Sequence, residues 1–456
     1  MQDLTSGSLS RHLLKTSSFM LVAMVFQTLY VLIDLYWVGR LGTDAVAAVA
    51  VSGNLTFVVI AATQMLGVGT TTLVSHAVGR KDHDTARLVF NQSLGLSATL
   101  GALFFAIAFA LRTPYANTLS ADADTASLAG DYLQWFIPSM ALQFPLVAMG
   151  AALRGTGNFK PGMIVQSATI VINIVLAPVL IFGWGTGVAL GVAGAALATL
   201  LAILVGTVWM AFYFAPPASY LRFSPPQMSP QRHLWLDMLK VGLPAGSEFG
   251  MMAVYLLVVY VVSRPFGASA QAGFGIGLRI IQACFMPVVA LGFAVAPVAG
   301  QNFGARRAER VRQTFYVAAG MAAGGMACVL LVSQAAAAPM VSVFTDEEAV
   351  VSVGEEYLHI VSWSFMASGV IFVASSMFQA MGNTVPSLVS SFMRIAGTAI
   401  PVLFLSKLPA FTLRWVWLLS AATVFAQMGL SLLLLRREFR RRLAFAAHVT
   451  APPAPV

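Results

Sequence analysis

Charged side chains are scarce in this chain of 456 residues. Asp, Glu, Lys and Arg make up 9% of it and hydrophobic residues 58%, whereas soluble domains hold roughly 25% and 45–50%. This scarcity excludes an ordinary soluble protein. Runs of about 20 apolar residues, long enough to cross a hydrocarbon core of ~30 Å as a helix, recur along the sequence. Because backbone in lipid must satisfy its own hydrogen bonds, we predict an all-α integral membrane protein.

Reactive and metal-ligating residues are also few. The two cysteines, Cys284 and Cys328, lie inside apolar runs without a CxxC spacing, and the six histidines are scattered. The chain has no Gly-rich loop with a lysine that would cradle phosphates. These absences predict no catalytic residues, no metal site, no cofactor and no direct use of ATP, so we expect a protein that is not an enzyme.

Twelve apolar runs are bounded by charge, Pro or Gly, and each predicts a membrane-spanning helix. They fall at 18–39, 46–75, 90–111, 132–152, 162–183, 190–214, 241–263, 273–298, 314–338, 357–378, 387–406 and 414–435. We therefore expect an N-terminal six-helix lobe at 1–214, a proline-rich cytoplasmic linker at 215–240, a second six-helix lobe at 241–440 and a cytoplasmic tail at 441–456.

The basic residues predict the orientation in the membrane. The net charge is +9, but Lys and Arg lie in short loops, which indicates topology instead of nucleic-acid binding. With both termini inside, nineteen of the 26 Lys and Arg residues fall on the cytoplasmic side and five on the other, where nine acids lie. The remaining two, Arg279 and Arg394, lie inside spans. We expect a multi-pass protein of the cell inner membrane with both termini cytoplasmic.

An internal repeat relates the two lobes. At a constant shift of 225 residues several landmarks align without gaps, among them Gly79 with Gly304 and Arg87 with Arg312. Each half has six spans, an even number, so the second half starts on the same side as the first. The repeats are therefore parallel, and a substrate path is expected between them near the midplane.

Four short motifs resemble those of the multidrug and toxic compound extrusion (MATE) transporters. The first span ends in Asp34-Leu-Tyr-Trp-Val-Gly39-Arg-Leu-Gly42, which is similar to the opening motif of that family. The other three segments are Leu153–Asn158 before Pro161, its repeat Gln379–Asn383 before Pro386, and Gly300–Gly304. With twelve spans in two sixes, the resemblance covers nearly the whole chain.

The resemblance implies a V-shaped pair of six-helix bundles that alternates between inward-open and outward-open states. It implies a secondary active transporter that expels small amphipathic, often cationic compounds in exchange for H⁺ or Na⁺. We expect a monomer in the lipid bilayer with no nucleic-acid partner. The alternatives are a flippase for lipid-linked saccharides of the same superfamily and a membrane-embedded enzyme, which would need several polar groups at one depth.

Asp34 is the strongest candidate for ion coupling, because a charge at the centre of a span costs about 2.5–3.5 kcal/mol and low dielectric favours the neutral, protonated acid. The alternative is an acid that only holds helices together. The family's pocket pattern Asn-x-x-x-Asp-Pro reads Asn173-Ile-Val-Leu-Ala177-Pro178 here, without the second carboxylate, while Thr199, one turn after Ala195, matches another oxygen donor. A Na⁺ site loses more from this than a proton site does, so H⁺ is favoured.

The second lobe offers three polar candidates inside spans: Glu248, Arg279 and Arg394. Arg279 and Arg394 are expected to be its buried bases, and an ion pair between Arg394 and Glu248 is expected to offset their cost in lipid. Glu248 does not occupy the position of the acid in the seventh span of NorM-type members, which reads as Met252. We therefore expect a DinF-like member whose ion site lies in the first lobe.

Overall fold

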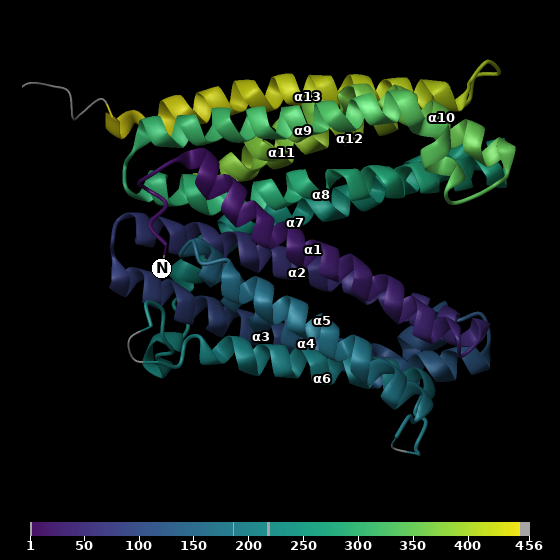
Figure 1. Cartoon of the computed structure of the whole chain (residues 1–456), viewed down its shortest axis with the longest axis horizontal. Helices are drawn as coiled ribbons and strands as arrows, with labels where there is room; N and C mark the ends of the chain where they lie inside the picture. The colour runs from purple at the N-terminus through teal and green to yellow at the C-terminus, as the bar shows by residue number, and fades with distance from the viewer. Residues whose placement is uncertain (1, 186, 217–218, 447–456) are drawn as a thin grey trace, which may run out of the picture. The chain divides into compact units, whose positions relative to one another are not determined.

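The computed structural model describes residues 2–185, 187–216 and 219–446, and Figure 1 shows a chain of long helices. Twelve helical segments within these residues are long and apolar enough to cross a membrane, as the sequence predicts. The first six are α1 (Leu9–Gly39), α2 (Thr43–Gly79), α3 (His83–Leu119), α4 (Ala123–Gly155), α5 (Lys160–Phe182) and α6 (Gly191–Phe212). The second six are α7 (Arg232–Ser263), α8 (Ala268–Gly304), α9 (Ala308–Ser342), α10 with α11 (Glu348–Val361 and Phe365–Ala380), α12 (Val385–Leu405) and α13 (Leu413–Arg442).

The chain divides into two compact units. Unit 1 comprises Met1–Asp3 and Ser18–Gly242, and unit 2 comprises Leu4–Ser17 and Leu243–Val456. In unit 1 a single apolar core is built around α2, α3, α4 and α6. Unit 2 has two apolar cores, one around α8, α9 and α11 and one that includes α7, α10 and α13. Each unit therefore holds most of one sequence repeat, with the exception of the segment before its first helix.

The segment expected as a linker, 215–240, packs on unit 1 over its described part. Two adjacent amides of α3 hold its backbone. Asn91 Nδ2 donates to the Arg222 carbonyl at 3.1 Å, while Asn91 Oδ1 accepts from Ser224 N at 2.9 Å. Gln92 donates to the carbonyls of Gln227 and Ser229 and accepts from Gln231 N. The linker therefore has a fixed course that ends in the first turns of α7.

The counterpart of this segment at the N-terminus, Leu4–Ser17, belongs to unit 2, and we call it the N-terminal strap. Leu4 N donates to Gln301 Oε1 at 3.0 Å, and Asn302 Nδ2 donates to the Leu4 carbonyl at 3.2 Å. The unit 2 side chains that hydrogen-bond the strap are Gln301, Asn302, Arg307 and Arg310. The Gly300–Gly304 motif thus has a structural task, which is to hold the start of the chain.

The tenth span is interrupted. Between α10 and α11 lies a 3₁₀ turn, Ser362–Ser364, and backbone groups released by such a break need partners inside a membrane. Gln334 of α9 supplies them: its Nε2 donates to the His359 carbonyl at 2.8 Å and to Ser362 Oγ at 2.7 Å. One amide therefore stabilises the break.

Two helices of unit 1 start at aspartates that accept from the first-turn backbone, as N-cap residues do. Asp82 accepts from Thr85 N at 3.0 Å before α3, and Asp122 accepts from Thr125 N at 2.7 Å before α4. Hydrogen bonds from the Thr85 side chain and backbone hold the pKa of Asp82 below its ordinary value. The capped ends fix where the apolar helices leave the loops. Of the tail at 441–456, residues 447–456 lie outside the described part of the chain.

Candidate ion-coupling site

Asp34 lies near the end of α1 and is half-buried within its unit. Its Oδ1 atom is buried and has no hydrogen-bond partner among the described residues. A buried polar atom without a partner is costly, and a carboxyl that gains a proton acquires a donor that can be satisfied by neighbouring oxygen atoms. Asp34 is therefore a side chain whose surroundings change with its protonation.

Asn173 of α5 and Thr199 of α6 meet in the interior of unit 1. Asn173 Nδ2 donates to Thr199 Oγ1 at 3.0 Å, and Thr199 Oγ1 donates to the Ala195 carbonyl at 3.2 Å. The Tyr30 hydroxyl of α1 lies 3.3 Å from the same Thr199 oxygen. A hydroxyl has one donor and two acceptor positions. With Tyr30 as donor, all three positions on Thr199 are used.

Tyr30 connects this hydrogen-bonded group to Asp34. It precedes Asp34 by one helical turn, so the two side chains lie on the same face of α1, and both Tyr30 and Tyr132 of α4 are within electrostatic range of the Asp34 carboxyl. The face of α1 that bears Asp34 is therefore directed toward α5 and α6. The sequence reasoning missed both tyrosines; the spacing of four residues from Asp34 would have indicated Tyr30, whereas no local pattern indicates Tyr132.

The position of the second family carboxylate is occupied by Ala177, which is 1% exposed. It lies one turn after Asn173 on α5, so it adds only a methyl group to the interior. Among the described residues, no three or more His, Cys, Asp or Glu side chains gather where they could hold a metal ion. Asp34 is thus the one carboxylate that the unit 1 spans bring to this group.

In unit 2, Glu248 of α7 is joined to α12 and α11. Ser387 Oγ donates to Glu248 Oε1 at 2.6 Å, and Ser375 Oγ lies 2.6 Å from Ser387 Oγ. These hydroxyl groups form a short chain that ends on the carboxylate. The sequence did not indicate either serine, because both are far from Glu248 along the chain and serines at helical spacing are common.

Arg394 does not form the expected ion pair with Glu248. The described residues contain two ion pairs, Lys240–Asp237 and Arg442–Glu438. Arg394 acts on the carboxylate at longer range, and its guanidinium lies over the Tyr255 ring at 5.6 Å from the centroid. Glu248 therefore receives a neutral hydrogen bond in place of a direct cation.

The expectation that Arg279 is a buried base was wrong. Its side chain is exposed on α8, while Gly277 and Ile280 on either side of it are buried. Arg279 lies at the depth of a span, as hydropathy indicates, but on the outward face of its helix within the described structure. Hydropathy gives depth along a helix and not the face on which a residue lies. Arg279 thus stands apart from the polar group around Glu248.

Comparison with known proteins gives the chain its family. The MatE family model matches residues 20–179 and 244–405, once in each half and over more than half of the chain. Similar curated proteins include the probable multidrug resistance protein YoeA of Bacillus subtilis, 27% identical over 87% of both chains, and the multidrug export protein MepA of Staphylococcus haemolyticus, 27% identical over 93% of both. A protein named FAD transporter from Shewanella oneidensis is 23% identical over 88% of both.

Solved structures agree. A MOP superfamily transporter from Pyrococcus furiosus matches with a TM-score of 0.87 and 24% identity over 96% of this chain and 98% of that one, which shows the fold. A MATE protein in complex with MaL6 matches with the same TM-score and coverage at 25% identity. The match of the family model to both halves, supported by the twelve-span fold, shows that this chain belongs to the MatE family, the multidrug and toxic compound extrusion transporters.

Proposed function

We propose that this transporter exports small amphipathic, cationic compounds by alternating access in exchange for protons, with Asp34 as the group that carries the proton. One observation carries the choice of proton over sodium: the oxygen atoms around Asp34 are already engaged. Thr199 donates to Ala195 and accepts from Asn173, with Tyr30 at its remaining position. A hard cation needs several free oxygen ligands, whereas a proton needs one carboxylate.

Proton transfer at Asp34 changes both charge and hydrogen bonding. The ionised carboxylate accepts hydrogen bonds only, and one of its oxygens is buried without a donor. Protonation removes the charge and turns one carboxyl oxygen into a donor. Because a buried charge is expensive in lipid, the two protonation states favour different packing of α1 against α5 and α6. This difference would bias the transporter between its two states.

The substrate class is inferred from relatives and from the single acid. Several similar proteins are named multidrug export or multidrug resistance proteins, and a cationic substrate can compete with the proton for one carboxylate. We further propose a monomer in the cell inner membrane with cytoplasmic termini, as the basic loops predict. The lack of a NorM-type acid in the seventh span supports a DinF-like member.

The test uses purified protein in lipid vesicles loaded with a fluorescent organic cation. An imposed pH gradient and an imposed Na⁺ gradient are applied separately to the wild-type protein and to Asp34→Asn. We expect the pH gradient to drive transport by wild type and the variant to lose it, because Asn keeps the shape but cannot titrate. Asp44→Asn, an exposed acid at the start of α2, is the matched control and should transport normally.

Three results would contradict the proposal. Undiminished proton-driven flux by Asp34→Asn would remove Asp34 as the carrier. Transport driven only by Na⁺ would show that the occupied oxygens do not exclude a metal cation. Equal loss in Asp44→Asn would show a general effect of removing an acid. Folding of each variant is checked by gel filtration and by its melting temperature.

A further inference from the structure

The last helix of unit 2 continues beyond its apolar part. In α13 the apolar residues end at Leu435, and the helix runs on to Arg442. Four arginines in this extension have exposed side chains, and they are Arg436, Arg437, Arg440 and Arg441. Residues four apart lie on one helix face, so these arginines form two adjacent pairs. Leu435, Glu438 and Phe439 are buried and face the unit instead. The extension is thus amphipathic, with a face of like charge.

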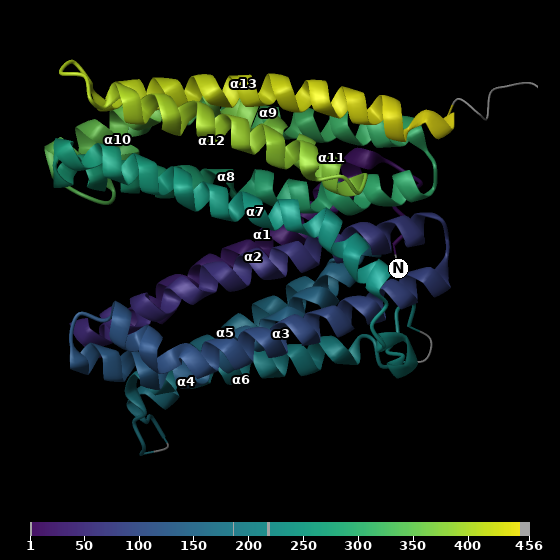
Figure 2. The ribbon, with the colours of Figure 1, turned by 180° about the vertical axis from the view of Figure 1, so that it is seen from behind.

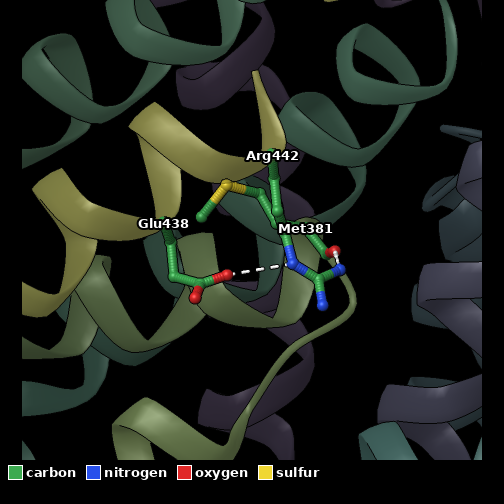
Figure 3. A network of polar contacts seen from close by, with 3 residues as sticks. All are labelled: Met381, Glu438 and Arg442. Atoms are coloured by element: carbon green, nitrogen blue, oxygen red, sulfur yellow. Dashed lines mark hydrogen bonds and ion pairs between the residues drawn. The ribbon is translucent and has the colours of Figure 1, made fainter. Parts of the chain in front are cut away.

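Side-chain contacts hold this helix end in place. Arg442 Nε lies 2.9 Å from Glu438 Oε2, and Arg442 Nη1 donates to the Met381 carbonyl at 2.8 Å, as Figure 3 shows. Met381 follows the last residue of α11, where backbone carbonyls lack helical partners. The Phe439 ring packs on Phe315 of α9 at a centroid distance of 6.2 Å. The exposed arginines are therefore carried by a docked helix end.

A fifth exposed arginine belongs to the same end of unit 2. Phe303 at the end of α8 packs on Phe445, with ring centroids 5.9 Å apart, and Arg306 follows in the turn after α8 (Figure 1 and Figure 2). The exposed acid of this end, Glu309, accepts from Gln313. We define the basic rim as Arg306, Arg436, Arg437, Arg440 and Arg441. Neither of the two ion pairs in the described residues includes a rim residue.

The rim lies where the polar surface of a bilayer would be. Between the exposed Trp415 and Arg436, α13 has about 20 residues, the number that crosses a hydrocarbon core of ~30 Å. Tryptophan is common at one membrane interface of a span, which places the first arginines at the opposite interface. The next turns reach the level of phospholipid headgroups. The rim therefore faces a phosphate-bearing layer and not open solution.

We propose that the basic rim of unit 2 binds the headgroups of anionic phospholipids in the adjacent leaflet. The guanidinium group is planar and donates paired hydrogen bonds to phosphate oxygens. Basic groups next to the end of a span attract anionic lipid. The docked helix end supplies such donors in fixed positions without a competing acid. The Arg442 contacts to Glu438 and Met381 hold the platform and are not part of the lipid surface.

The test measures lipid stabilisation of the full-length protein in detergent micelles. Phosphatidylglycerol or phosphatidylcholine is titrated into wild type, into a quadruple variant with Arg436, Arg437, Arg440 and Arg441 changed to Gln, and into the same quadruple change to Lys. We expect phosphatidylglycerol to raise the melting temperature of wild type more than phosphatidylcholine does. In the Gln variant the apparent affinity for phosphatidylglycerol should fall at least about tenfold. The Lys variant should keep most of it, because charge is retained.

Controls separate lipid binding from folding. Arg414→Gln removes an arginine at the opposite end of α13 and should leave the phosphatidylglycerol response unchanged. High salt should reduce the response of wild type. If the quadruple Gln variant does not fold, the pair Arg436→Gln with Arg440→Gln is measured and should show a smaller loss. An unchanged phosphatidylglycerol response in a folded Gln variant, or an equal response of wild type to both lipids, would overturn the proposal.

Discussion

Ser17 and Gly242 are equivalent positions of the internal repeat, 225 residues apart, and at each the chain passes from one compact unit to the other. The N-terminal strap ends at Ser17 in unit 2, and the linker with the start of α7 ends at Gly242 in unit 1. The segment before the first helix of each half is thus held by the opposite half. Because α1 and α7 each begin in one unit and end in the other, movement of the units must be accommodated within these two helices.

We first predict that Asn302→Leu releases the N-terminal strap. Asn302 is fully buried, donates to the Leu4 carbonyl and accepts from Arg310 Nε at 3.1 Å. Leucine has a similar size but leaves these groups without their partner, at a cost of about 1–3 kcal/mol per group. The melting temperature should fall, and trypsin should cleave faster at Arg11 and Lys15. Gln313→Ala, an exposed change on α9, is the control; equal cleavage rates in both variants would argue against strap release.

A second prediction concerns the close approach of α7 to α2 in unit 1. A Cβ atom added at Gly242 would meet the Met65 carbonyl oxygen of the α2 backbone, so Gly242→Ala must separate the two helices. Overpacking of this kind costs about 1–3 kcal/mol, and the melting temperature should fall accordingly. In the same helix, a Cβ at Gly250 meets nothing within 4 Å. Gly250→Ala should be neutral or stabilising, and a similar loss in both variants would refute the packing argument.

The sequence predicted the twelve spans because the length and polarity of a span depend on local residues. The exchanged segments were beyond its reach. Leu4–Ser17 and 215–240 are short, polar and without a long hydrophobic run, so nothing local shows which half they bind. The clasp residues Asn91 and Gln92 have no equivalents at the repeat shift, where Tyr316 and Val317 stand. The repeat therefore reveals the scaffold but not the contacts that differ between its halves.

For the ion site, sequence reasoning reached the residues that a motif or an unusual charge marks. Asn173 and Thr199 do meet, and Asp34 lies on the α1 face that also presents Tyr30. The hydroxyl group on Glu248 comes from Ser387, 139 residues away, and only the packing of α7 on α12 brings it there. Arg279 was misjudged because depth in a span does not define a helix face. Long-range pairing and facing direction are thus the parts that required a structure.

The third prediction concerns pH and Asp82, the N-cap of α3. Hydrogen bonds from Thr85 lower the pKa of Asp82, so its contribution to stability is complete above about pH 4, the ordinary Asp value. The contribution is lost as the pH falls through the lowered pKa. Asp82→Ala should therefore be less stable than wild type at neutral pH, and the difference should shrink in acid. Asp82→Asn, which keeps the acceptor oxygen, should retain most of the cap at both pH values; a gap for Asp82→Ala that grows in acid would reverse the assigned sign.

The last prediction adds the carboxylate that this chain lacks. Ala177 is buried one turn after Asn173, so Ala177→Asp places two further oxygens and a second acid in the interior of unit 1. At about 4 Å and an effective dielectric of about 20, attraction between a carboxylate and a monovalent cation is about 4 kcal/mol. That is more than the 1.4 kcal/mol needed for a tenfold change in affinity.

We therefore expect Ala177→Asp to gain Na⁺-driven transport by at least about tenfold over wild type in the same vesicles. Ala177→Asn has the same size without the charge, and it should remain dependent on the pH gradient. If an imposed Na⁺ gradient drives both variants equally, the added oxygen matters and the added charge does not. If it drives wild type already, the occupied hydroxyl of Thr199 is no barrier to Na⁺, and Asp34 alone does not define a proton site.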